Sequence, residues 1–233
     1  MTGKQFSSVW LREPRKATSP GLSREEIVNA AVALLDEEGL AGLSMRKLGA
    51  KLQAGATSLY WHVSHKDELL ELVYDQVWGE MSVPEPEEAG WREAASALAR
   101  SMRIVMLRHP WSADLLGRMP ALGPNALQIA DRLRRIFISA GFQGIDVEYA
   151  GSALTAYIYG MTTPEVAWNT VMGERQYDAD EMRAQVARVV KDFPGMLERI
   201  NLDAYDDPQA IRETAFDFGL TSVLDGLERR LTT

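Results

Sequence analysis

The sequence predicts an all-α protein with a small N-terminal domain and a larger C-terminal helical domain. Apolar residues recur at helical spacing through most of the 233 residues, and no segment beyond residue 90 has the pattern of a strand. A linker rich in proline and glutamate, residues 82–90, divides the chain into unequal parts. The chain has no cysteine, which excludes a disulfide framework, a thiolate nucleophile and a zinc ribbon.

Residues 1–21 are expected to form a flexible basic arm, because glycines and prolines interrupt any periodicity. The first helix is predicted to begin after Ser23. Ser23 and Glu26 are spaced as a capping box, in which the hydroxyl and the carboxylate each accept a backbone N–H of the other residue. Gly39 is expected to end this helix. Its apolar stripe consists of Ile27, Ala30, Ala31, Leu34 and Leu35.

Two short helices are predicted to follow the first. Ser44 is placed to cap a helix of about two turns that ends near Leu52. Residues 53–55 include a glycine and make a tight connection to the next helix, which runs from Ala56 to about Val63. A longer helix followed by two short ones with a tight turn between them is the helix-turn-helix arrangement.

A fourth helix is predicted over residues 65–81, capped by Ser64 with Asp67 three positions further on. This helix completes an expected N-terminal domain, residues 22–81, and leads to an expected C-terminal domain, residues 91–233. If the helix is continuous, a tilt at its far end would swing the third predicted helix as a rigid body.

The charge of the chain is unevenly distributed. The formal net charge of −8 argues, taken alone, against a nucleic acid as partner. Residues 39–66, however, contain no aspartate or glutamate. A basic footprint on an otherwise acidic protein is what phosphate binding by one small module requires. The basic residues of this stretch are Arg46, Lys47, Lys51 and Lys66.

The third predicted helix carries side chains suited to reading base edges in the major groove. Thr57 and Ser58 can form hydrogen bonds with bases, and the methyl groups of Ala56 and Thr57 can contact a thymine methyl. Flanking aromatic and basic groups can contact phosphates. These flanking groups are Tyr60, His62, Lys66 and, where the dipole of the second helix favours an anion, Arg46.

The C-terminal domain is predicted to consist of helices. Pro164 falls inside the fourth of these helices and is expected to kink or divide it. The predicted helices cover residues 91–108, 112–119, 125–140, 146–172, 179–193 and 209–231.

Two of these helices have more apolar surface than one chain needs for its core. Residues 149–164 carry no charge, so this helix should be buried on most sides. The last helix has one apolar stripe through Phe216 and Leu220 and an adjoining one through Ile211 and Phe218. One stripe serves the monomer and the other would face water, which favours a homodimer.

The N-terminal motifs resemble those of the tetracycline-repressor (TetR) family. The resemblance rests on residues 42–49, 56–63 and 66–70, above all on Leu-Tyr-Trp-His-Val at residues 59–63. It implies a repressor that binds double-stranded operator DNA, takes a small-molecule effector, and dimerises through a four-helix bundle of the last helices. By position, it implies DNA contacts by Arg46, Ala56, Thr57, Ser58, Tyr60, Trp61, His62 and Lys66.

Several alternatives stay open for these residues. Trp61 could pack in the core of the small domain or expose an edge to DNA, and Tyr60 could be structural. Met45 and Ala56 stand where tetracycline repressors have polar reading residues, so a different operator sequence is expected.

The resemblance also implies a ligand cavity in the C-terminal domain. Residues 115–119 contain no histidine, whereas tetracycline repressors use one in this segment to hold the magnesium of the drug. We therefore expect an apolar or aromatic compound rather than tetracycline, although each candidate lining residue could instead be ordinary core. The candidates are Met102, Met106, His109, Trp111, Met119, Tyr157, Met161 and Trp168.

Other classes of protein find little support. An enzyme or a ligand carrier is the first rival, but the motifs of a serine hydrolase, a dinucleotide site and a zinc protease are absent. His62 and His65 lack a third ligand nearby, so neither a metal nor a cofactor is expected. An activator of the same fold is the second rival. Neither a signal peptide nor an apolar membrane span is evident, so we expect a cytoplasmic protein without membrane contact.

Overall fold

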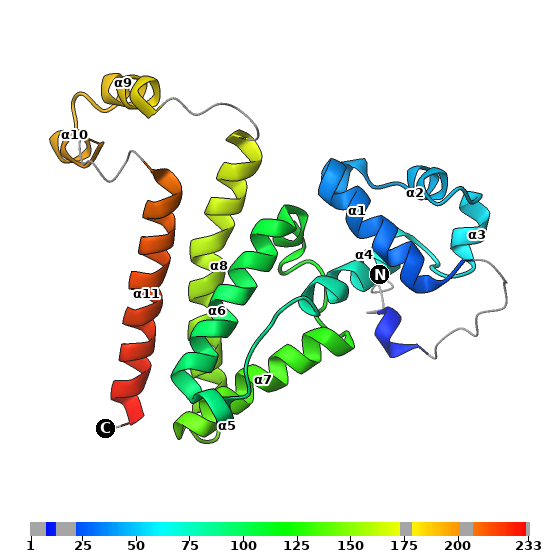
Figure 1. Cartoon of the computed structure of the whole chain (residues 1–233), viewed down its shortest axis with the longest axis horizontal. Coiled ribbons are helices and arrows are strands. Elements are labelled where there is room, and N and C mark those ends of the chain that lie inside the picture. The colour runs from blue at the N-terminus through cyan, green and yellow to red at the C-terminus, as the bar shows by residue number, and fades with distance from the viewer. Residues whose placement is uncertain (1–7, 13–21, 173–178, 201–206, 232–233) are drawn as a thin grey trace, which may run out of the picture. The chain divides into compact units, whose positions relative to one another are not determined.

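The computed structural model describes residues 8–12, 22–172, 179–200 and 207–231. Every regular element in these ranges is a helix, which confirms the all-α prediction (Figure 1). The chain divides into two compact units, residues 1–152 and 153–233, and the boundary falls inside helix α8 (Asp146–Met172). Among the described helices, none combines the length and the apolar character needed to cross a membrane.

The N-terminal helices form much as the sequence predicts. At the start of α1 (Arg24–Gly42), the backbone N–H of Glu26 donates to Ser23 Oγ at 3.1 Å, and the N–H of Ser23 donates to Glu26 Oε2 at 2.7 Å. The regular helix breaks at Gly39, whose φ is 66°, and one more turn follows. The helices that follow are α2 (Met45–Lys51), α3 (Ala56–Tyr60) and α4 (Lys66–Trp78).

Helix α4 begins and ends differently from the prediction. Its N-cap is His65 rather than Ser64, because His65 has the extended backbone of a cap and its Nδ1 accepts the N–H of Glu68 at 3.1 Å. The Glu68 carboxylate in turn accepts the N–H of Ser64 at 2.9 Å. The helix ends at Trp78, before the predicted residue 81.

One apolar core holds the helix-turn-helix together and extends past the linker. Leu59 of α3 and Leu69 of α4 are fully buried in it, and burying a leucine contributes about 1.5–3 kcal/mol. Val105, Trp111 and Leu115, which follow the linker in sequence, belong to the same core. The helix-turn-helix is therefore packed directly against the next part of the first unit, and not merely tethered to it.

Residues 8–12, expected as part of the flexible arm, instead form a turn, η1 (Val9–Leu11), against α4. The buried carboxylate of Glu71 on α4 accepts hydrogen bonds from Ser8 Oγ at 2.5 Å and from the N–H of Val9 at 3.0 Å. A buried carboxylate requires such donors, and η1 supplies them. The remainder of the predicted arm lies outside the described residues.

The rest of the first unit contains helices that the sequence predicts closely and two that it does not. Helix α6 (Trp91–Arg108) matches its prediction, and α7 (Pro124–Ala140) begins one residue early. A single turn, α5 (Pro86–Ala89), forms inside the predicted linker. The predicted helix over residues 112–119 is instead a tighter 3-10 turn, η2 (Pro110–Leu115).

The second unit contains the remainder of α8 with α9 (Ala179–Val189), α10 (Pro194–Ile200) and α11 (Pro208–Leu231). Helix α8 continues through Pro164 over its 27 residues, so the predicted division at this proline is wrong. The prediction missed α10. The core side chains of this unit include Leu154, Ile158, Phe216 and Leu220.

Candidate nucleic-acid interface

Helix α3 is anchored by one apolar side chain and presents its polar ones to solvent. Leu59 is fully buried, whereas Thr57, Ser58 and Tyr60 are exposed. The side chain of Ala56 lies outside what the structure describes. The hydroxyl groups predicted to read bases are therefore available on the surface of the first unit.

Trp61 follows α3 directly, and the residue is 69% exposed. A tryptophan that served only the core would bury its ring, so the core interpretation is wrong for this residue. The exposed indole places apolar surface next to the hydroxyl groups of Thr57 and Ser58.

Two of the residues predicted to contact phosphates are less available than expected, because one is buried and the other forms hydrogen bonds within the protein. His62 is only 8% exposed. Lys66 Nζ donates to the carbonyl oxygens of Leu40 at 3.1 Å and Leu43 at 2.8 Å, which α1 leaves unpaired at its end. An ammonium has three N–H donors, so one remains for a phosphate.

The basic residues of α2 differ in what they contact. Lys47 and Lys51 form ion pairs with Glu38 and Glu37 of α1, the second with 2.7 Å between Lys51 Nζ and Glu37 Oε1. Arg46 is exposed and forms no ion pair within the described part of the chain. Because the two lysines are partly neutralised, Arg46 carries more of the expected attraction to phosphates.

Gln53, in the turn between α2 and α3, is a candidate DNA contact that the sequence did not indicate. Its φ of 51° lies in the left-handed region that favours glycine, and its side chain is exposed. The nearby Gly55 indicated a turn, but it does not show which residue adopts this conformation.

Two family profiles together match most of the chain. The profile of bacterial regulatory proteins of the tetR family matches residues 27–73, and that of the tetracyclin repressor-like C-terminal domain matches residues 83–231. The chain belongs to the TetR family of bacterial transcriptional regulators.

Relatives of this TetR-family regulator span nearly the same length. An HTH-type transcriptional regulator of Saccharopolyspora erythraea is 41% identical over 85% of this chain and 84% of its own. The HTH-type transcriptional repressor DrrR1 of Streptomyces coeruleorubidus is 32% identical over 93% and 81%. Among solved structures, the TetR family protein ActR of Streptomyces coelicolor in complex with actinorhodin has a TM-score of 0.74 and 30% identity, covering 91% of this chain and 100% of that one.

The candidate ligand residues of this TetR-family protein are divided between the two units. In the first unit, Met102 and Met106 of α6 are buried, and Met119 packs partly buried against the core that holds the helix-turn-helix. His109 and Trp111 are buried and form hydrogen bonds with Asp36 of α1, so both already have a structural partner.

The candidates of the second unit lie on α8. Tyr157 is half-buried and donates its hydroxyl hydrogen to the carbonyl oxygen of Phe216 at 2.5 Å. Met161 and Trp168 are each more than a third exposed. These two side chains are therefore accessible within their unit.

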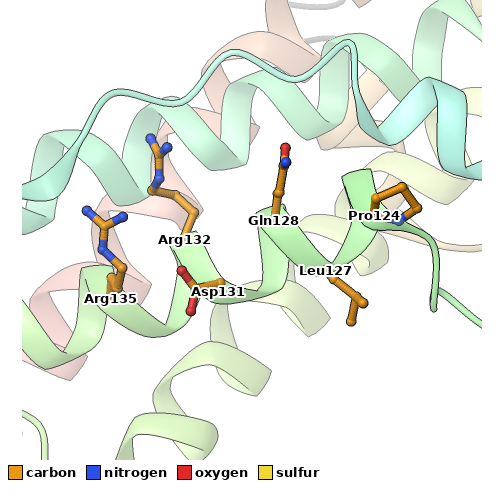
Figure 2. Close-up of a pocket in the computed structure, with 6 residues that line it drawn as sticks. All are labelled: Pro124, Leu127, Gln128, Asp131, Arg132 and Arg135. Atoms are coloured by element: carbon orange, nitrogen blue, oxygen red, sulfur yellow. The ribbon is translucent and has the colours of Figure 1, made fainter.

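An open groove of about 440 Å³ runs along α7 in the first unit (Figure 2). Figure 2 shows Arg132 and Arg135 pointing the same way from α7 and Leu127 pointing elsewhere. Arg132 pairs with Glu85 at 2.5 Å, and Arg135 pairs with Glu85 and Glu87 and holds the pKa of Glu87 below its ordinary value. The arginines are thus neutralised by their neighbours. The groove is lined by Pro124, Leu127, Gln128, Asp131, Arg132 and Arg135, which do not include any candidate ligand residue.

Proposed function

We propose that this TetR-family regulator is a repressor that binds a pseudo-palindromic operator as a homodimer and releases it when a small aromatic or apolar ligand binds. Residues 22–81 act as the DNA-binding domain with residues 1–21 as its arm, and residues 91–233 bind the ligand and dimerise. The proposal places the protein in the cytoplasm and assigns it neither a catalytic reaction nor a cofactor.

The exposed face of α3 carries the proposal. Thr57 and Ser58 present hydroxyl groups, Tyr60 and Trp61 present exposed rings, and the buried Leu59 fixes them on one rigid support. Hydroxyl groups with aromatic and basic neighbours on a short helix suit base edges and phosphates in the major groove. The repressor DrrR1, 32% identical over 93% of the chain, favours repression over activation.

The second unit supports the homodimer. One side of α11 is buried through Phe216, Leu220 and Leu224, while Phe218 on the opposite side is 76% exposed. Within α8, Val171 is exposed as well. A single chain leaves these apolar side chains in water, and a second copy would cover them.

The ligand class rests on the soft and aromatic character of the candidate residues. Met161 and Trp168 are accessible apolar groups in the second unit, and thioether and indole groups suit an apolar or aromatic guest. ActR, which is 30% identical, was solved with the small molecule actinorhodin. That complex supports a small-molecule effector for this chain too.

Selection of binding sites from random duplexes tests the operator and the dimer. Selected sequences should contain an inverted repeat with half-site centres about 34–36 Å apart, and single half-sites should bind poorly. Trp61→Ala should lower affinity for the selected duplex about tenfold or more, and Arg46→Ala should reduce the salt slope by about one. Fluorescence anisotropy against salt concentration measures both.

Phe193→Ala is the matched control, because Phe193 is an exposed aromatic residue of the second unit. It should bind the duplex like the parent. Selected sequences without an inverted repeat would contradict the proposal. A promoter-reporter assay in cells with and without the gene separates a repressor from an activator.

A further inference from the structure

A polar junction joins α1 to the corner between α6 and η2. Asp36 Oδ1 of α1 accepts a hydrogen bond from the indole Nε1 of Trp111 at 2.7 Å and lies 2.8 Å from His109 Nδ1. The other ring nitrogen of His109, Nε2, lies 3.1 Å from the carboxylate of Glu80. Arg108 also donates to Glu80, at 2.7 Å. The junction, defined as Asp36, Glu80, Arg108, His109 and Trp111, therefore connects three segments of the first unit.

The rings in this junction are buried, so their nitrogen atoms require hydrogen-bond partners within the protein. His109 and Trp111 are almost fully buried, and their rings meet edge to face at 5.9 Å. Asp36 is the more exposed partner, and from α1 it contacts the indole N–H of Trp111 and a ring nitrogen of His109. Burial raises the pKa of Glu80, but hydrogen bonds from His109 and Arg108 outweigh it and lower that pKa below its ordinary value. A buried N–H without an acceptor is costly, so the two rings favour one position of Asp36.

Helix α1 is also firmly joined to α2 and to the recognition helix α3. Its end accepts two hydrogen bonds from Lys66, and its Glu37 pairs with Lys51 of α2. Leu59 of α3 is buried in the same core as Ile27 and Leu35 of α1. A displacement of α1 would therefore carry the recognition helix with it.

We propose that Asp36 is a positioning residue: through His109 and Trp111 it fixes α1, and with it the recognition helix α3, against the α6–η2 corner. This inference rests on the proposed function, because it names the contact through which movement at the end of α6 reaches the DNA-reading helices. The route runs beside α4 and does not need α4 to act as the sole lever. Breaking it releases the helix-turn-helix from its operator-reading position while the helices themselves stay folded.

A distance measurement within one chain tests the position directly. Because the chain has no cysteine, Ala50→Cys on α2 and Ala130→Cys on α7 provide two unique labelling sites. Single-molecule energy transfer is measured on the full chain diluted with unlabelled protein. The parent should show one narrow distance, and Asp36→Leu should show a broadened distribution with a second population, at unchanged helical content by circular dichroism.

Two further variants separate positioning from loss of a surface charge. Asp36→Asn keeps an oxygen that can accept both N–H groups and should restore the narrow distance. Glu93→Leu removes an exposed carboxylate of α6 that lies outside the junction and outside the helix-turn-helix, and it should also stay narrow. If Asp36→Leu unfolds, Trp111→Phe removes the indole N–H together with part of the ring, and it should broaden the distribution to a lesser degree.

Operator affinity provides the functional readout. With the selected duplex, Asp36→Leu should bind about tenfold more weakly than the parent, while Asp36→Asn and Glu93→Leu should stay within about twofold. A parent-like narrow distance in folded Asp36→Leu or Trp111→Phe would overturn the inference, and so would equal broadening in Glu93→Leu. If the parent binds no duplex at all, the proposed function fails, whereas the distance measurement still decides the role of Asp36.

Discussion

At the scale of single residues, burial separates side chains that are neighbours in the sequence. Within residues 59–62, Leu59 and His62 face the core, whereas Tyr60 and Trp61 face solvent. The string of residue types predicted a DNA-reading segment. It left open which side chain serves packing and which is available to a partner, because a segment of about one turn has no periodicity long enough to define its faces.

Gln53 provides a test at this scale. Gln53→Gly should raise the free energy of unfolding by about 0.5–1 kcal/mol, because a residue with a Cβ is strained at a φ of 51° and glycine is not. The midpoint of urea unfolding, followed by circular dichroism, measures the change.

Ala54→Gly is the matched control, since Ala54 is the next residue in the same turn and is not among the residues with positive φ. It should lower the free energy of unfolding, because glycine loses more conformational freedom on folding. Equal destabilisation by the two variants would show that Gln53 is not strained.

At the scale of elements, α4 provides the cap that α7 lacks. The residue before α7 is Gly123, which has no capping side chain. Asp75 of α4 fills that role: its Oδ1 accepts the N–H of Ala126 at 2.9 Å, and its Oδ2 lies 3.1 Å from Asn125 Nδ2. A Cβ at residue 123 would come within 2.1 Å of the Asp75 carboxylate, so glycine is required by this close approach.

Asp75→Ala should lower the free energy of unfolding by about 1–3 kcal/mol at neutral pH, because the buried N–H groups at the start of α7 lose their acceptor. Burial raises the pKa of Asp75 above its ordinary 3.8, against the opposing hydrogen bonds from Ala126 and Asn125. The folded protein thus holds the proton more tightly than the unfolded chain. This contribution to stability is complete below pH 3.8 and is lost as the pH rises through the raised pKa.

The advantage of the parent over Asp75→Ala should therefore be larger in acid than at neutral pH. Urea unfolding at several pH values measures it, with Asp131→Ala, an exposed carboxylate of α7, as the control that stays close to the parent. An advantage that grows with pH would contradict a raised pKa for Asp75 in the folded protein.

At the scale of the whole molecule, apolar surface remains that one chain does not cover. Residues 149–164 were expected to be buried on most sides, yet within this range Tyr149 is 64% exposed. The expectation is wrong for a single chain, because one side of the helix packs inward and the other remains in water. The proposed homodimer accounts for this surface.

Phe218→Glu should shift the protein from dimer to monomer, because a carboxylate would have to be buried without a partner in the dimer interface. Size-exclusion chromatography with light scattering measures the mass, which should approach the 25.9 kDa of one chain. Affinity for the full operator should fall with it. Leu127→Glu, at an exposed apolar residue of the first unit, should remain dimeric. Dimers in both variants would place the interface elsewhere.

The sequence by itself determined what depends on local chemistry and on residue spacing. The capping box at Ser23 and Glu26, the end of the regular helix at Gly39 and the bounds of α6 follow from hydrogen bonds and periodicity within a few turns. The TetR family follows from the order of residue types in residues 23–75, because that order alone identifies the motif.

Only the tertiary structure decided which distant residues meet. Asp36 and His109 are separated by 73 positions, and Asp75 and Ala126 by 51, so no local pattern connects them. From the sequence, Lys66 was predicted to contact phosphates. In the folded protein its ammonium group donates to the carbonyl oxygens of Leu40 and Leu43. The physical reason is that a buried donor or acceptor must find a partner wherever the packing of helices provides one, and packing is a property of the whole chain.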